Sequence, residues 1–283
     1  MAVLTPGGTS GYNFEKFART VEAATYQKMK FIPRIKDIER LYDQITVRKH
    51  TRASASTLTQ SQSGVGSGLT YSTTAGTPVV VTPAGQYVAI AWSANEESQV
   101  EFDIPGEVQS ELTQALAEAS ETSACANIAT LTNFMSDTGV DAAMFRVAYG
   151  RLMGFTNGVA TPGSDPQVYG IFSHTQYPNL ASIPEFNNAE VRGDSENPNV
   201  KGIWMRGGGV MLMLTTVLTE DANGIHNCLF LPEAFVISWN KRSQVVRDRD
   251  GLQQSLICFN NFGSAVLHNE RAIGMRTTVS AIA

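Results

Sequence analysis

Two histidines and two cysteines toward the C-terminal end of the chain carry the side chains that zinc binds most often. His226 and Cys228 are separated by one residue, and Cys258 and His268 follow later. Structural zinc sites use paired ligands of the CxxC or HxxxH type, because two side chains must reach one tetrahedral ion from a single turn. These four residues lack that pairing. Buried thiols and histidines at strand ends are therefore the favoured interpretation, and no metal site is predicted.

Two glycine-rich runs are the remaining candidates for a ligand-binding loop. In GVGSGL, at 64–69, the third glycine falls one position too early for a dinucleotide fingerprint, and no strand or helix is expected around it. The three glycines at 207–209 lead into a strand, so they do not present a helix N-terminus to a phosphate. His50 belongs to a basic strand face, and His174 has no carboxylate near it in sequence. With no nucleophile, metalloprotease or P-loop motif, neither an enzyme nor a cofactor is predicted.

The charge of the chain is low and unevenly distributed. Charged residues make up 17% of the 283 residues, and the net charge is −5, which argues against a dedicated nucleic-acid reader. Residues 28–52 nevertheless carry a net charge of +5, which leaves −10 for the rest. The basic residues of this segment are Lys28, Lys30, Arg34, Lys36, Arg40, Arg48, Lys49 and Arg52. The asymmetry suggests that the basic segment lies against another region of the same subunit or against a neighbouring subunit. A basic face exposed to solvent is the alternative.

Cysteine usage and hydropathy limit where such a protein is made. The three cysteines are an odd number without a close pair, and no basic-then-apolar signal opens the chain. Both features favour synthesis in a reducing cytoplasm, with the thiols buried. No apolar run reaches the 18 residues that a membrane helix needs, so no membrane partner is expected.

Residues 53–95 contain no Asp, Glu, Lys, Arg or His. Strands are predicted at 45–54, 79–82 and 86–94, and in the last of these Val88, Ile90 and Trp92 share one face. The Ser-, Thr- and Gly-rich stretch between the first two would be a flexible tip. Together they predict a long two-stranded arm with no third strand nearby in sequence. An isolated hairpin is marginal in water, so this arm needs something else to pack on.

The other elements are helices and antiparallel strands in separate blocks, which predicts the α+β class. A helix capped by Asn13 would place Phe14 and Phe17 on an apolar stripe, and it would end before Pro33. The longest predicted helix covers 103–135, and a second helix begins at Thr138 or Asp141 and contains Met144, Phe145, Ala148 and Leu152. Strands are predicted at 167–173, 210–219, 228–239, 252–262 and 264–279, with a short helix at Pro232.

Two stretches in this order resemble a known family. QVEFDIPGEVQSELTQALAEASE, at 99–121, is similar to the segment that leads into the spine helix of tailed-bacteriophage major capsid proteins, the Hong Kong phage-type fold also seen in encapsulin nanocompartments. Residues 227–278 resemble the late segment of that family. There a P-E-A-F helix leads into a long hairpin, a Phe-Gly turn, and a final strand beginning at Glu270.

The resemblance extends over essentially the whole chain and implies a division into parts. These are an N-terminal arm at 1–38, an extended loop at 39–100, a peripheral domain with the spine helix at 101–138, an axial domain at 139–250, and closing strands of the peripheral domain at 251–283. It implies a coat protein that self-assembles into pentamers and hexamers of an icosahedral shell around double-stranded DNA. An encapsulin-type compartment is the alternative, and the long arm and loop favour the virus.

The arm, the basic segment and the loop are the expected contacts between subunits. The residues concerned are Phe14, Phe17, Arg34, Lys36, Arg40, Arg48, Arg52, Val79, Val80, Val81 and Trp92. The basic segment would pair with acidic surface on adjacent subunits or face packaged DNA non-specifically, and the −10 elsewhere favours the first. A separate scaffolding protein, a portal protein and a decoration protein are the other implied partners. The protein would reside in the virion after synthesis in the host bacterial cytoplasm. Because Lys49 is the only loop lysine and lies near its base, no crosslinking is predicted.

Overall fold

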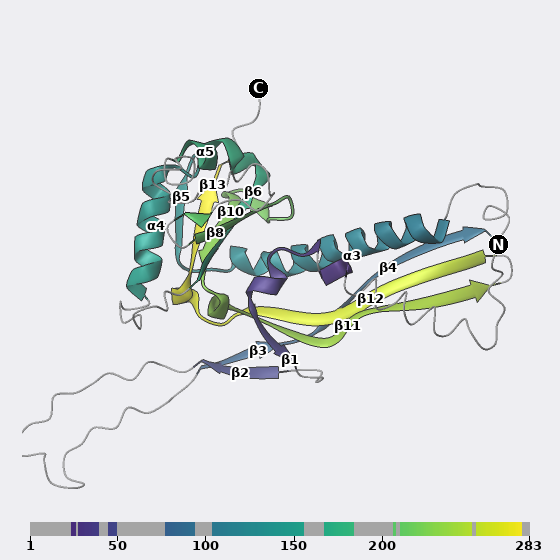
Figure 1. Ribbon diagram of the computed structural model, residues 1–283. Helices are drawn as coiled ribbons and strands as arrows, with labels where there is room; N and C mark the ends of the chain where they lie inside the picture. The colour runs from purple at the N-terminus through teal and green to yellow at the C-terminus, as the bar shows by residue number, and fades with distance from the viewer. Residues whose placement is uncertain are drawn as a thin grey trace, which may run out of the picture.

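The computed structural model describes residues 24–26, 28–39, 45–49, 77–93, 104–155, 167–183, 206–207, 210–250 and 253–278. Within these, a long helix lies along a four-stranded sheet, and a second, seven-stranded sheet stands at one end of it (Figure 1). Helices are combined with mostly antiparallel strands, so the α+β prediction is confirmed, although helices and strands alternate between residues 104 and 182 instead of forming separate blocks. None of the described helices is long and apolar enough to cross a membrane.

The four-stranded sheet has the order β1-β11-β12-β4. Two long antiparallel strands form its centre, β11 (Phe235–Asp250) and β12 (Gln253–Val266). β4 (Ala84–Ser93) adds an antiparallel edge to β12, and the short β1 (Lys36–Glu39) pairs in parallel with β11. The strand prediction at 86–94 is thus confirmed, but its partner is not the arm. Hydrogen-bond pairing with β12, distant in sequence, removes β4 from the two-stranded arm that local periodicity predicted.

One face of this sheet is covered by α3 (Ile104–Ala129). Leu112 and Leu116 are fully buried against Trp92 and Leu256. The helix predicted at 103–135 extends too far at its C-terminal end, since α3 ends at Ala129. Bonds from Thr130 and Leu131 to carbonyls three residues earlier tighten the last turn, and the chain then forms β5 (Phe134–Asp137). Parallel pairing of β5 with β13 (Ala272–Thr277) therefore overrides the helical pattern there.

The second sheet has the order β5-β13-β10-β6-β8-β7, with β9 paired to β10. Its remaining strands are β6 (Val168–Ser173), β7 (Arg206–Gly207), β8 (Val210–Thr215), β9 (Glu220–Asp221) and β10 (Gly224–Phe230). The carboxylate of Asp141 accepts a bond of 2.7 Å from the Met144 N–H and so caps α4 (Ala142–Phe155). The four predicted core residues of α4, Met144, Phe145, Ala148 and Leu152, are all buried. A short α5 (Tyr177–Ser182) follows η3 (His174–Gln176).

The C-terminal block differs from its prediction in three details. The P-E-A-F helix is a single 3-10 turn, η4 (Pro232–Ala234), between β10 and β11. Phe262 and Gly263 are not a turn but lie inside β12, which joins the strand predicted at 252–262 to the first residues of the strand predicted at 264–279. The final strand begins at Ala272, because residues 269–271 form the 3-10 turn η5 (Asn269–Arg271).

Sheet membership also divides the chain differently from the boundaries given above. β11 lies in the four-stranded sheet with α3, although residues up to 250 were assigned to the axial domain. β13 lies in the seven-stranded sheet, although residues after 250 were assigned to the peripheral domain. The long pairing of β11 with β12 and the insertion of β13 between β5 and β10 are the physical reasons.

The arm itself is a two-stranded sheet of β2 (Ile45–Lys49) and β3 (Thr77–Val81). Its base packs on the four-stranded sheet through a small apolar cluster of Val81, Val236 and Leu267. Figure 1 shows the two strands leaving at the end of the sheet nearest the second sheet and pointing away from the far ends of β4, β11 and β12. The predicted tip between them lies outside the described residues.

Candidate subunit-contact surface

The three consecutive valines of β3 differ sharply in exposure. The side chain of Val81 is 1% exposed, Val79 is half-buried, and Val80 is 49% exposed. Alternation along a strand produces this pattern, since neighbouring side chains point to opposite faces. Val81 therefore fixes the hairpin to its own subunit, and Val80 is the valine that faces outward.

Trp92 is also held inside the subunit. Its side chain is 8% exposed and packs with Leu112, Leu116 and Leu256 between β4, α3 and β12. In this position it stabilises the sheet against the helix and offers little surface to a neighbour. Its burial argues against the predicted contact with another subunit.

The opposite face of the same strands carries exposed apolar side chains. Tyr87 on β4 is 75% exposed, and Val246 on β11 is 45% exposed. Between them on β12 lie Ile257 and Phe259, both half-buried. The strand register aligns Tyr87 with Phe259, and it aligns Ile257 with Val246, so the four side chains share one face. We call the face that carries these four side chains the outer face of the sheet.

Sequence reasoning missed the outer face, although a signal for it was present. Only the even positions of 86–94 were assigned to a buried face. The odd positions, Tyr87, Ala89 and Ala91, are exposed yet carry no charge. Uncharged residues on both faces of a strand at the edge of a sheet indicate that neither face is meant for water alone.

The predicted basic contacts are spread along the N-terminal segment. Arg34 is half-buried in η1 (Ile32–Arg34) and donates from Nη1 to the carbonyl of Lys30 at 2.9 Å. Lys36 is exposed on β1, and Arg48 lies in β2 opposite Pro78. The other predicted contacts lie outside the described residues, namely Phe14, Phe17, Arg40 and Arg52.

A buried carboxylate holds this segment on the long helix. Glu121 on α3 is 4% exposed, and its Oε1 accepts bonds from the backbone N–H groups of Phe31 at 2.8 Å and Ile32 at 3.1 Å. No described side chain forms an ion pair with it. Burial raises the pKa of the Glu121 carboxyl, and the bonds from the two N–H groups oppose part of that rise. The ring of Phe31 packs edge-on against Phe230 and Phe235, at 5.1 and 5.2 Å between centroids.

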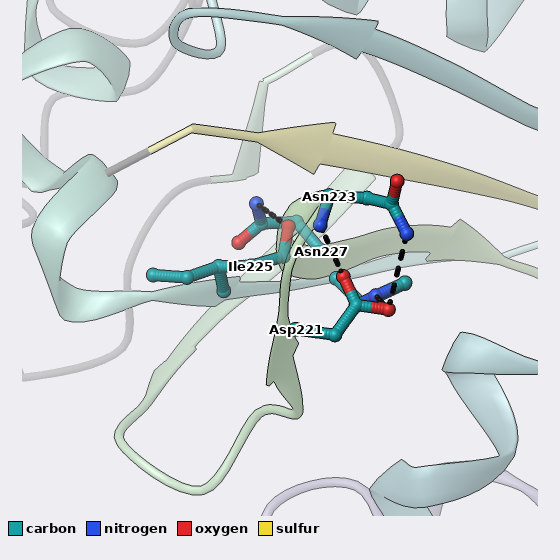
Figure 2. A network of polar contacts seen from close by, with 5 residues as sticks. Asp221, Asn223, Ile225 and Asn227 are labelled. Carbon is teal, nitrogen blue, oxygen red and sulfur yellow. Dashed lines mark hydrogen bonds and ion pairs between the residues drawn. The ribbon is translucent and has the colours of Figure 1, made fainter. Parts of the chain in front are cut away.

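The turn between β9 and β10 contains the one histidine–carboxylate pair of the described second sheet. Figure 2 shows Asp221 accepting bonds from Asn223, whose backbone N–H lies 2.7 Å from Oδ1. Nε2 of His226 is 2.9 Å from Asp221 Oδ2, and these contacts lower the pKa of the Asp221 carboxyl. The buried amide of Asn227 donates to Thr277 Oγ1 at 2.9 Å and ties the turn to β13. This geometry satisfies a tight turn, and among the described residues it brings no nucleophile to the histidine.

The four candidate zinc ligands are not brought together. Cys228 lies in the core cluster beneath α3, and Cys258 lies in the separate cluster with Trp92. His226 pairs with Asp221, and Nδ1 of His268 is 3.3 Å from Glu270. Burial raises the pKa of Cys258 to about 11 and that of Cys228 still further, so neither thiol is a nucleophile at neutral pH.

Comparisons with known proteins agree with this architecture. No protein-family profile and no curated protein matches the sequence. Among solved structures, the capsid of Ralstonia phage GP4 matches with a TM-score of 0.66 at 9% identity, over 88% of each chain. The capsid of the cyanophage P-SCSP1u matches with a TM-score of 0.63 at 12% identity, over 87% of this chain and 86% of that one. A virus-like particle from Pyrococcus furiosus matches with a TM-score of 0.63 at 11% identity, over 93% and 99%. The fold implied by the sequence resemblance is confirmed.

Proposed function

We propose that this chain, which has the Hong Kong phage-type capsid fold, is a major capsid protein. Its subunits assemble into pentamers and hexamers of an icosahedral shell that encloses double-stranded DNA. One observation carries the proposal: a hairpin that carries no charge from residue 53 onward leaves the subunit in one direction, while an apolar outer face lies open in the other. In a protein that stays monomeric in solution, a projecting hairpin and an exposed apolar face would only promote aggregation.

The two features complement each other between copies. The described strands of the hairpin, β2 and β3, point away from the far ends of the sheet that carries the outer face, so these strands do not cover that face within one subunit. A neighbour's hairpin can, and it buries Val80 together with Tyr87 and Val246. Each subunit then gives a hairpin on one side and receives one on the other, a heterologous contact that closes into rings. The lack of charge in 53–95 fits this contact, because desolvating an unpaired ion costs more than most contacts contribute.

The remaining parts are assigned by sheet. The four-stranded sheet with α3 forms the peripheral domain, and the seven-stranded sheet forms the axial domain whose loops meet at the five- and six-fold axes. Arg34, Lys36 and Arg48 pair with acidic surface on adjacent subunits, with packaged DNA as their non-specific alternative partner. A separate scaffolding protein, a portal protein and a decoration protein complete the particle, which is the protein's location after synthesis in the host cytoplasm. The shell is not crosslinked.

Three exposed valines provide a matched test. Val80 on the hairpin, Val246 on the outer face and Val147 on α4 are 49%, 45% and 46% exposed. Electron microscopy and sedimentation of the recombinant protein are expected to show rings or uniform shells. Val80→Asp and Val246→Asp should fold but lose most assembly, whereas Val147→Asp should assemble. A stable wild-type monomer at high concentration, or equal assembly by all three variants, would contradict the proposal.

An encapsulin-type compartment is the second candidate. The match to the Pyrococcus furiosus virus-like particle, which extends over nearly all of both chains, favours it. The two functions differ in what the shell holds. Particles isolated from cells that produce the protein naturally should contain nuclease-protected double-stranded DNA if it is a phage capsid. A protein cargo without protected DNA would instead support the compartment.

A further inference from the structure

The chain crosses over the four-stranded sheet where the hairpin joins it. Pairing of β4 with β12 ends at Ala84 and Phe262. The next residue back, Pro83, has no N–H and cannot extend the ladder. β3 therefore departs from the plane of the sheet and lies against β12 instead of beside it.

At the crossing, the backbone of Thr82 lies directly on Gly263. A Cβ on Gly263 would stand 2.6 Å from the Thr82 carbonyl oxygen and 2.8 Å from its carbonyl carbon. It would also stand 2.9 Å from Cγ1 of Val81. Two of these three atoms are backbone, so no side-chain rotation relieves the overlap. Only glycine permits this close approach.

The crossing is surrounded by small and buried apolar residues. Gly263 and Ala265 alternate along one face of β12, and Ala265 is aligned with Val236 on β11. Val81 rests there at 1% exposure, against Val236 at 0% and Leu267 at 5%. The neighbouring Phe262 points to the other face and is buried under α3. We call Gly263, Ala265, Val236 and Leu267 the seat of the hairpin.

We propose that Gly263 is a positioning residue that fixes the angle at which the hairpin leaves the subunit, and thereby the curvature of the shell. The inference rests on the proposed function. β3 extends about 17 Å from the seat at about 3.4 Å per residue, so it acts as a lever. Lifting Thr82 off the seat tilts this lever and displaces every contact that the hairpin makes farther out. A heterologous contact closes at a given ring size only for one angle between neighbours, so the tilt changes which assembly closes.

Gly263→Ala and Gly85→Ala are the matched pair of variants. Gly85 lies in β4 of the same sheet, and a Cβ there would be 4.0 Å from its nearest neighbour, the carbonyl of Asn260. Urea denaturation and circular dichroism report folding, and electron microscopy with mass photometry reports particle diameter and mass. Gly263→Ala should fold and associate but lose shells of wild-type diameter, forming other sizes or open sheets. Gly85→Ala should give wild-type shells.

Pro83→Ala is the second variant, because it loosens the crossing without any overlap at the seat. It should broaden the distribution of diameters while the subunit stays folded. Gly263→Ala shells of wild-type diameter and yield would overturn the inference and leave the proposed function standing. Loss of folding in Gly263→Ala would also overturn it, since the seat would then serve the fold and not the angle. Absence of shells from the wild-type protein would overturn both.

Discussion

Replacing Glu121 tests whether the buried carboxylate anchors the N-terminal segment. Glu121→Ala leaves the backbone N–H groups of Phe31 and Ile32 without their acceptor in a site that is almost closed to water. A buried donor without a partner costs about 1–3 kcal/mol, so the two donors predict a loss of about 2–6 kcal/mol of unfolding free energy, and the space left by the side chain adds to this loss. Glu121→Gln keeps one carbonyl oxygen in place and should lose less.

The difference in stability between the wild-type protein and Glu121→Gln should depend on pH, and the sign of this dependence is defined. Burial raises the pKa of Glu121 above its unfolded value, so the folded state binds the proton more tightly than the unfolded state does. The stability that Glu121 contributes is therefore fully present below the unfolded pKa and is lost as the pH rises through the folded pKa. Wild-type stability relative to Glu121→Gln should therefore fall as the pH rises above the ordinary carboxyl pKa.

Urea denaturation of unassembled subunits, at a protein concentration too low for association, measures both effects. Glu118→Gln is the control, because Glu118 lies on the same helix but is exposed, and its carboxylate accepts a bond from the side chain of Gln114. Amide hydrogen exchange at Phe31 and Ile32 should accelerate in Glu121→Ala and not in the control. A wild-type protein that gains stability over Glu121→Gln as the pH rises would refute the reasoning, since it would mean that the ionised carboxylate is the form favoured by folding.

Two further outcomes follow from burial and open space. Gly150→Ala on α4 should raise unfolding free energy by about 0.5–1 kcal/mol, because nothing lies within 4 Å of the new Cβ and glycine disfavours a helix interior; an unchanged denaturation midpoint would contradict this. The three thiols are buried, and burial raises the pKa of each, so a thiol reagent at neutral pH should label none in the native subunit and all three after unfolding.

Local patterns in the sequence identified most elements but not their partners. Alternation in 86–94 placed Val88, Ile90 and Trp92 on the correct face, because that information lies within the strand. It could not reveal that β4 pairs with β12, far along the chain. The glycine of Phe262-Gly263 suggested a turn, since turns are the commonest reason for glycine. Its actual reason is the backbone of Thr82, which no local pattern contains.

Glu121 shows that a usable signal can be passed over. A glutamate in a helix rich in alanine and serine suggests a solvent-facing position. Its spacing from Ala117, Ala124, Cys125 and Ile128, which are all buried, places it instead on the apolar stripe. A charged residue in such a stripe requires a compensating partner, and here the partners are backbone N–H groups from a segment about ninety residues earlier. The stripe could have indicated burial, but not the identity of the donors.

The two edges of the four-stranded sheet differ in charge, and this difference bears on how subunits can contact one another. β1 covers β11 only as far as Trp239, and beyond it β11 carries Lys241 and Arg242, both exposed. Charges on the open side of an edge strand discourage pairing with another chain. β4, on the opposite side, carries no charge at all along its ten residues. A long uncharged edge is a liability in a protein that stays alone, so its retention beside the open outer face is expected only where a neighbour covers that side of the subunit.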